Sequence, residues 1–187
     1  MLPFLEFWNR IYFSLYSILL YISHYVLGSI LEYLLVRPLY SFPIIRRRLK
    51  KNGLTSYKTW IKTADSYYEN PRTGRLMYFT NGAITYVLLG LWLLCFNIFY
   101  IVFGVSVRTF MFTHLKFIII LITGLSILFC QIVIWHKERY IKYFDQFNKE
   151  GLNKRIVWCI GTLAFCIILT VAIYSTFMYA EMKNGFL

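Results

Sequence analysis

The chain has 187 residues, of which 59% are hydrophobic, and a formal net charge of +12. Soluble domains are about half apolar, so this composition excludes an ordinary soluble domain and indicates an integral membrane protein. Four apolar runs reach the length of about 20 residues that a helix needs to cross a bilayer. They occupy residues 11–36, 81–105, 115–135 and 156–179. These runs predict an all-α fold with four transmembrane helices in a single membrane domain over residues 1–187.

Polar and small residues in the first run recur at spacings of three and four positions. At about 100° per residue they share one narrow face of a helix, and large apolar residues cover the rest. Such a face requires protein or water, because ionisable groups are costly inside a bilayer. We expect it to form either a helix-packing stripe or the lining of a pore. The stripe consists of Ser14, Ser17, Tyr21, His24, Gly28 and Glu32.

Basic residues are concentrated in the two longer connections, residues 37–79 and 136–155. Because Lys and Arg favour the inner side of a membrane, both connections are predicted to face the cytosol, or the matrix of an organelle. With four spans, both termini then lie outside, and Arg10 is expected at the outer end of the first helix. This arrangement is typical of a protein of a bacterial inner membrane or an organelle inner membrane.

A basic cluster follows the first run, after prolines at positions 38 and 43 that are expected to stop helix propagation. Beside a membrane such a cluster can bind anionic lipid headgroups or contact a partner, or simply lie in solvent as a topology determinant. Since the membrane already accounts for it, nucleic-acid binding is not expected. The cluster consists of Arg46, Arg47, Arg48, Lys50 and Lys51.

Residues 55–68 and 136–150 each place apolar and aromatic side chains on one helical face and charged side chains on the other. We expect two basic amphipathic helices at the inner membrane surface, with Trp60 and Phe144 directed at the membrane or at a partner. A straight continuation of the third span would carry the second of them far from the bilayer. The chain is therefore expected to bend near residues 135–136, or the last span must project inward.

Small and polar residues also lie on narrow faces of the later spans. Small residues let another helix approach closely, and a buried Asn can hydrogen-bond across the contact. The residues expected to serve helix packing are Gly82, Gly90, Asn97, Thr162 and Cys166. For Asn97 the alternative is a ligand or pore group, and the four cysteines are expected to act as apolar packing residues.

Signatures of catalysis are missing from the sequence, including nucleotide-binding glycine motifs, the HExxH motif and clusters of potential metal ligands. We therefore expect no enzyme activity, no cofactor and no metal site. The sequence predicts a non-catalytic membrane subunit that packs against other integral subunits of a larger complex. The alternative is a homo-oligomeric channel, pore or membrane effector whose first-helix stripe conducts ions or protons.

Overall fold

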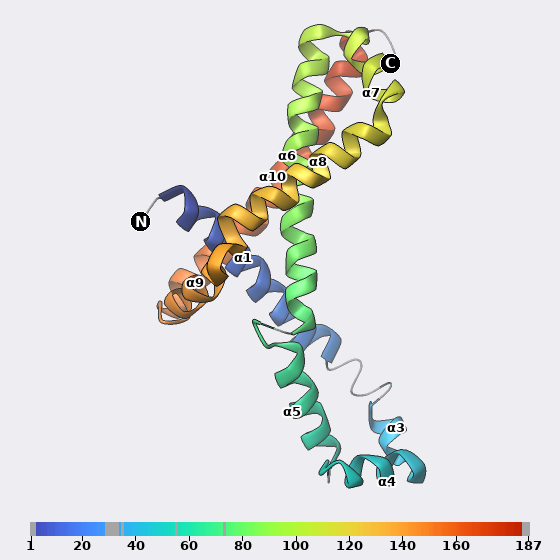
Figure 1. Ribbon diagram of the computed structural model, residues 1–187, viewed down its shortest axis with the longest axis vertical. Coiled ribbons are helices and arrows are strands. Elements are labelled where there is room, and N and C mark those ends of the chain that lie inside the picture. Colours follow the sequence, from blue (N-terminus) through green and yellow to red (C-terminus); the bar gives the residue numbers. More distant parts are fainter. Residues whose placement is uncertain (1–2, 29–33, 35, 55, 73, 185–187) are drawn as a thin grey trace. The chain divides into compact units, whose positions relative to one another are not determined.

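The computed structural model describes residues 3–28, 34, 36–54, 56–72 and 74–184. All regular elements among them are helical, as predicted (Figure 1). In chain order they are α1 (Pro3–Tyr21), the π-helical η1 (Ile22–Gly28), α3 (Arg37–Ser41), α4 (Pro43–Lys51), α5 (Tyr57–Tyr68), α6 (Arg75–Phe103), α7 (Val105–Thr113), α8 (Leu115–Cys130), the π-helical η3 (Gln131–Trp135), the short 3₁₀ turn η4 (His136–Glu138), α9 (Arg139–Asn148) and α10 (Leu152–Lys183).

Three helices of the described residues are long and apolar enough to cross a membrane. They lie within Arg75–Phe103, Leu115–Asn148 and Leu152–Lys183. These correspond to the second, third and fourth predicted spans. The first predicted span, residues 11–36, begins in α1 and continues through η1 into residues 29–33 and 35, which lie outside the described part of the chain.

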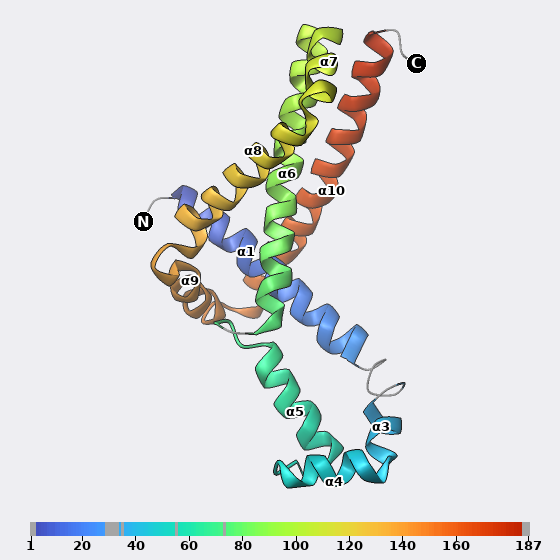
Figure 2. The same ribbon diagram turned by 45° about the vertical axis from the view of Figure 1, so that its right-hand side comes forward.

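The chain divides into two compact units. Unit 1 consists of Met1–Leu15 and Gly82–Leu187, and unit 2 consists of Tyr16–Asn81. In unit 1, α6 and α10 lie side by side (Figures 1 and 2), and the Asn97 amide nitrogen donates to the Ile173 carbonyl oxygen at 2.9 Å. Unit 1 therefore holds nearly all of the three apolar helices together with the first half of α1.

Gly104 separates α6 from α7 and allows the chain to turn there. Its backbone has φ 68° and ψ −150°, a conformation that is essentially restricted to glycine. The end of α10 is tied to this corner, because the Lys183 Nζ atom donates to the Ile101 carbonyl oxygen at 2.8 Å. One end of unit 1 is thus closed by a glycine turn and by a lysine that satisfies a free carbonyl of α6.

Of the two alternatives expected after the third span, a bend near residues 135–136 or an inward-projecting last span, the structure has a bend, two residues later than expected. Lys137 and Glu138 both have positive φ, at 54° and 53°, directly after the π-helical η3. Left-handed conformations at two successive residues other than glycine end a helix and redirect the chain. The helix α9 then starts in a new direction at Arg139.

Aromatic side chains pack the first half of α1 against α8 and α9. The Trp8 and Phe129 rings lie 5.1 Å apart, and the Phe13 ring lies 5.1 Å from Phe144 and 5.5 Å from Phe147. Edge-to-face pairs of this kind contribute beyond the area that they bury. Phe144, which was expected to face the membrane or a membrane-level partner, is instead buried among aromatic residues of its own chain.

Unit 2 contains α3, α4 and α5 and the ends of two longer helices. Phe42 is extended and precedes Pro43 at the start of α4, so the prolines separate two short helices. The predicted helix at residues 55–68 is observed as α5, and the Ser56 hydroxyl oxygen caps it by accepting from the Lys58 and Thr59 amides. The helices α3 and α4 were not predicted from the sequence.

Candidate functional site

The contact between α6 and α10 contains two residues that were expected to serve helix packing. A Cβ atom at Gly90 would lie 3.1 Å from the Leu169 side chain, which is tighter than ordinary van der Waals contact. Seven residues later on α6, the Asn97 amide donates to the Ile173 carbonyl oxygen and to the Thr176 hydroxyl oxygen at 3.1 Å. A small residue and an interhelical hydrogen bond thus occur on the same contact, as in membrane helix pairs.

The other three residues expected to serve helix packing, Gly82, Thr162 and Cys166, lie outside the contact of Gly90 and Asn97 with α10. Thr162 is buried and faces the interior of unit 1, and Cys166 is half-buried one turn later on α10. Gly82 is exposed, and a Cβ atom added to it would meet nothing within 4 Å. The structure therefore brings Gly90, Asn97 and Thr162 into packed surroundings, but gives Gly82 no neighbour in the described part of the chain.

The predicted stripe of the first helix is divided between the two units. In unit 1 Ser14 is buried, and its carbonyl oxygen lies 4.0 Å from the Cys159 sulfur. In unit 2 Ser17 is half-buried, Tyr21 and His24 are exposed, and the His24 Nδ1 atom lies 3.3 Å from a Glu69 carboxylate oxygen. Gly28 belongs to the π-helical segment, and Glu32 lies outside the described residues.

Arg10, directly before the stripe, anchors α1 to unit 1. Its Nη1 and Nη2 atoms donate to the two carboxylate oxygens of Glu150 at 2.9 Å and 2.8 Å. Its Nε and Nη2 atoms both donate to Glu6, at 3.0 Å and 2.9 Å. The guanidinium carbon also lies 4.3 Å from the centre of the Phe147 ring and 5.1 Å from that of Trp158. We call Arg10 and these four neighbours, Glu6, Phe147, Glu150 and Trp158, the Arg10 clamp.

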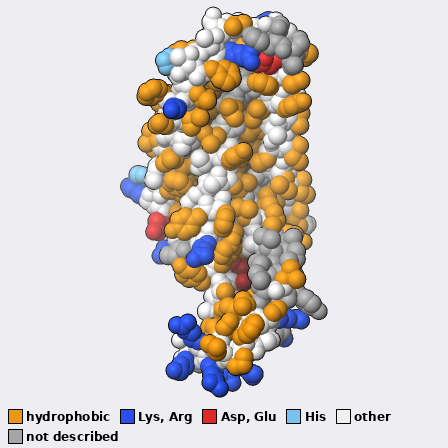
Figure 3. All heavy atoms as spheres, turned by 90° about the vertical axis from the view of Figure 1, so that its right-hand side faces the viewer, with side chains coloured by type: hydrophobic (Ala, Val, Ile, Leu, Met, Phe, Trp, Pro, Cys, Tyr) orange, Lys and Arg blue, Asp and Glu red, His pale blue; other side chains and the backbone are white. Residues whose placement is uncertain are grey.

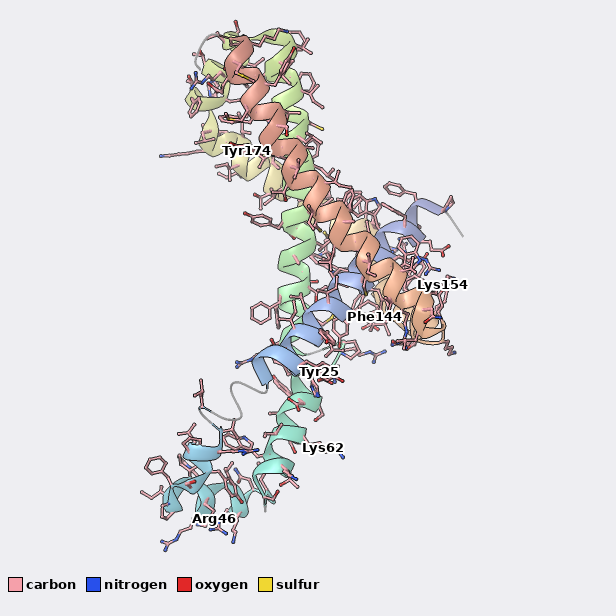
Figure 4. All side chains as sticks on the ribbon, turned by 180° about the vertical axis from the view of Figure 1, so that it is seen from behind. Tyr25, Arg46, Lys62, Phe144, Lys154 and Tyr174 are labelled. Atoms are coloured by element: carbon pink, nitrogen blue, oxygen red, sulfur yellow. The ribbon has the colours of Figure 1, made fainter. Side chains whose placement is uncertain are left out.

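The electrostatics of the Arg10 clamp follow from these short contacts. Hydrogen bonds from Arg10, assisted by one from Lys154 at 3.0 Å, lower the pKa of Glu150 from 4.5 to about 2. The hydrogen bond to Glu150 in turn raises the pKa of Arg10. A bidentate pair between two charged groups with little exposure is strong because both partners keep their hydrogen bonds while most water is excluded. Figure 4 shows Lys154 on the first turns of α10 and Phe144 on the neighbouring α9.

The clamp contradicts one part of the predicted orientation. Arg10 was expected on the outer side of the membrane and the connection 136–155 on the inner side, yet Arg10 contacts Glu150 directly. Two residues in contact lie on the same side of a bilayer, so those two expectations cannot both hold. The ion pair between Glu6 and Arg10 is predictable from the sequence, because the two residues are four positions apart on one helix. The contact between Arg10 and Glu150 is not, because those residues are 140 positions apart.

The basic cluster lies on α4 in unit 2. Arg46 and Arg47 occupy its middle, and Arg48, Lys50 and Lys51 occupy its last turn. No residue of this helix is buried, and the Ile44 side chain on it is 80% exposed. The other residue expected at a headgroup or partner surface, Trp60, is half-buried on α5.

The described residues contain no group of three or more His, Cys, Asp or Glu side chains that could hold a metal ion. Comparison of the chain with known protein families, curated proteins and solved structures finds no match.

Proposed function

We propose that the chain is a non-catalytic integral membrane subunit in which α10 packs against a transmembrane helix of another protein. The observation that carries this proposal is an exposed face of α10 that contains three small residues. Gly161, Ala164 and Ser175 are exposed, and together with the exposed Ile168 and Val171 they lie within an arc of about 80°. This uncovered face points away from the contact with α6.

Lipid covers large apolar side chains well, but a track of small residues is what a second helix requires for close approach. A Cβ atom at Gly161 would meet nothing within 4 Å. Of the most apolar window of α10, only 11% is buried inside the chain. Apolar side chains cover much of the surface seen in Figure 3. The small residues of the uncovered face of α10 favour a neighbouring helix over lipid at that position.

The membrane arrangement that we propose has three spans, formed by α6, by α8 with η3, and by α10. The Arg10 clamp supports this arrangement, because it holds the first half of α1 at the start of α10. The first half of α1 then lies across the inner ends of the spans, on the same side as residues 136–155. By the positive-inside rule that side faces the cytosol or the matrix, so the N-terminal part is inside and the C-terminal part outside.

The helix α4 is proposed to bind anionic lipid headgroups on that inner side. Arg46 projects from α4 in Figure 4, and the apolar side chains of Phe42 and Ile44 beside the cluster are exposed. Basic and apolar groups on one short helix are typical of an interfacial segment. Each basic residue near such a surface contributes about 1 kcal/mol of attraction.

The alternative function, a pore lined by the stripe of the first helix, gains little support from the same contacts. Ser14 is buried in unit 1, and Arg10, next to the stripe, is engaged by two carboxylates. His24 has a carboxylate neighbour in Glu69. These contacts favour a packing role for the first half of the stripe. We therefore propose the subunit, and the crosslinking experiment below distinguishes it from a homo-oligomeric pore.

Photocrosslinking in native membranes tests the subunit proposal. A photoreactive phenylalanine analogue at Ala164 should give one discrete adduct, because a neighbouring helix covers that position. The matched control is Thr170, which is also exposed on α10 but lies outside the uncovered face, and it should give none. An adduct at twice the mass of the chain would identify a second copy and favour the homo-oligomeric alternative. Equal yields at both positions would overturn the proposal.

The proposed sidedness is tested by cysteine labelling in sealed vesicles, with the native cysteines replaced. Single cysteines at Phe4, Lys50 and Lys149 should all be protected from a membrane-impermeant reagent added outside. A cysteine at Lys183 should react, because the C-terminal end of α10 lies outside in this arrangement. Labelling of Phe4→Cys from outside would contradict the three-span arrangement and would favour a first helix that crosses the membrane.

A further inference from the structure

A cavity of about 180 Å³ lies at the end of unit 1 that carries α7. Its walls come from α6, α7 and α10 and from the first residue of α8, and they are mostly apolar, with Leu93, Phe96, Phe112 and Phe177 among them. For comparison, an apolar cavity of about 150 Å³ accepts a molecule the size of benzene. The space is therefore large enough for one aromatic ring or a short branched alkyl group.

Polar groups meet at this cavity from three helices. Glu181 on α10 is only 5% exposed, and its Oε2 atom lies 3.5 Å from the Nη1 atom of Arg108 on α7. A charge-assisted hydrogen bond between such groups is normally about 2.7–2.9 Å long. The pair is therefore attracted but loosely joined, in contrast to the Arg10 clamp.

Tyr100 on α6 supplies a buried hydroxyl to the same place. The residue is 4% exposed, and its hydroxyl interacts with both Glu181 and Arg108, through their charges and through weak side-chain hydrogen bonding. Among the described residues, no contact of this hydroxyl has the distance and angle of an ordinary hydrogen bond. A buried hydroxyl without a good hydrogen bond is energetically unfavourable. An unsatisfied donor that lines a cavity is the feature that a ligand would satisfy.

We propose that this cavity binds a neutral apolar molecule bearing a hydroxyl group, an alcohol or a phenol, or the hydroxyl end of a longer amphiphile. Arg108 and Glu181 neutralise one another, so a charged ligand would gain no net attraction from the pair and would lose its hydration among apolar side chains. A hydroxyl can donate one hydrogen bond and accept others. It donates to Glu181 and accepts from Tyr100, while its apolar body occupies the space among the aromatic side chains.

Asn97 gives the cavity a fixed wall. Its amide nitrogen is engaged by Ile173 and Thr176 on α10, so α6 and α10 are joined where the cavity lies between them. The corner at Gly104 and the bond from Lys183 to Ile101 hold the other side. A site built by such cross-links is preorganised, which lowers the entropy lost when a ligand binds.

Photoaffinity labelling of the purified full chain in lipid nanodiscs tests the proposal. The probe is benzyl alcohol that carries a diazirine on its ring, and labelled positions are mapped by mass spectrometry. Labelling should concentrate on α6, α7 and α10 around the cavity, and excess benzyl alcohol should compete for it. Toluene, benzoate and benzylamine of the same size should compete about tenfold less well, because each lacks a hydroxyl or carries a charge.

Two variants that keep the size of the side chain sharpen the test. Tyr100→Phe removes only the hydroxyl, and Glu181→Gln replaces the charged acceptor with an amide. Each should weaken competition by benzyl alcohol about tenfold. Tyr86→Phe, at an exposed tyrosine of the same helix, should change nothing.

Three results would overturn the proposal. They are labelling spread evenly over the exposed faces of the helices, competition by toluene or benzoate equal to that by benzyl alcohol, and unchanged competition in Tyr100→Phe. The competitor series uses the unaltered chain, so it stands even where a variant fails to fold. None of these readouts depends on α10 having a partner helix, so this proposal and the subunit proposal can fail separately.

Discussion

An arginine is paired with glutamate near each end of α10, and the two arrangements are built differently. At the start of α10, Arg10 gives every contact to Glu150 and Glu6 at 3.0 Å or less. Towards its end, Arg108 approaches Glu181 at 3.5 Å beside a cavity. A carboxylate saturated with short hydrogen bonds is a structural group, whereas a buried carboxylate with a loose partner keeps its capacity for a ligand.

The largest effect is expected from breaking the tight pair. Arg10→Met leaves Glu6 without its cation and leaves Glu150, whose side chain is only 15% exposed, with Lys154 alone. Loss of one partner of a buried pair costs about 3–5 kcal/mol, so the free energy of unfolding should fall by that order. Chemical unfolding of the chain in detergent micelles measures it. Arg46→Met on the exposed α4 is the matched control, and a loss below about 1 kcal/mol for Arg10→Met would show that the clamp is dispensable.

Acid should remove the same stabilisation without a substitution. The pKa of Glu150 is lowered from 4.5 to about 2 in the folded chain. Its contribution is therefore complete above about pH 4.5 and is lost as the pH falls towards 2, because the unfolded chain binds the proton first. Thermal unfolding of the wild type and of Glu150→Gln should differ at pH 6 and converge towards pH 2.5. A constant difference over that range would contradict the assignment of the shift to this pair.

Much of the unit 1 fold was predictable because its signals are local. The apolar runs at 115–135 and 156–179 lie within the observed Leu115–Asn148 and Leu152–Lys183, and the run at 81–105 overlaps Arg75–Phe103 but extends past the end of that helix at Phe103. The expectation of a bend near residues 135–136, or of an inward-projecting last span, followed from counting the residues available for a return to the membrane. Length and hydrophobicity decide these features, and both are read from consecutive residues.

The clamp and the cavity could not be predicted in the same way. Arg10 and Glu150 are 140 residues apart, and positive charge near an apolar run indicates a membrane boundary without naming a partner. Arg108 on α7 and Glu181 on α10 likewise are far apart in the sequence and meet only in the folded chain. In unit 2, α3 and α4 were not predicted because each is short and has a proline near its start. A proline is equally compatible with the start of a helix and with a loop.

A smaller effect is expected at the corner beside the loose pair. Gly104 has a positive φ of 68°, and a Cβ atom there would lie 3.1 Å from the Asn184 side chain. Gly104→Ala should therefore cost about 1–3 kcal/mol of unfolding free energy. Gly124→Ala on α8, where a Cβ atom would meet nothing within 4 Å, should be neutral or stabilising because alanine favours helices. Equal effects at the two glycines would mean that the corner does not require its unusual backbone.

The smallest effect is expected from neutralising the loose pair itself. Glu181→Gln keeps an oxygen that can accept from Arg108, and the Arg108 side chain is 30% exposed, so water can still solvate its charge. The cost in unfolding free energy should stay below about 1 kcal/mol, as for other partly exposed pairs.

Double-mutant cycles put the two pairs on one scale, because a cycle isolates the pairwise coupling from the effect of each substitution alone. The cycle of Arg108→Met with Glu181→Gln should give a coupling of a few tenths of a kcal/mol, whereas Arg10→Met with Glu150→Gln should give about 2 kcal/mol or more. The difference should persist in 0.5 M salt, since screening weakens exposed pairs and leaves enclosed pairs largely unchanged. Equal couplings would mean that Glu181 is held as firmly as Glu150, and its carboxylate would then have no spare capacity for the hydroxyl of a ligand.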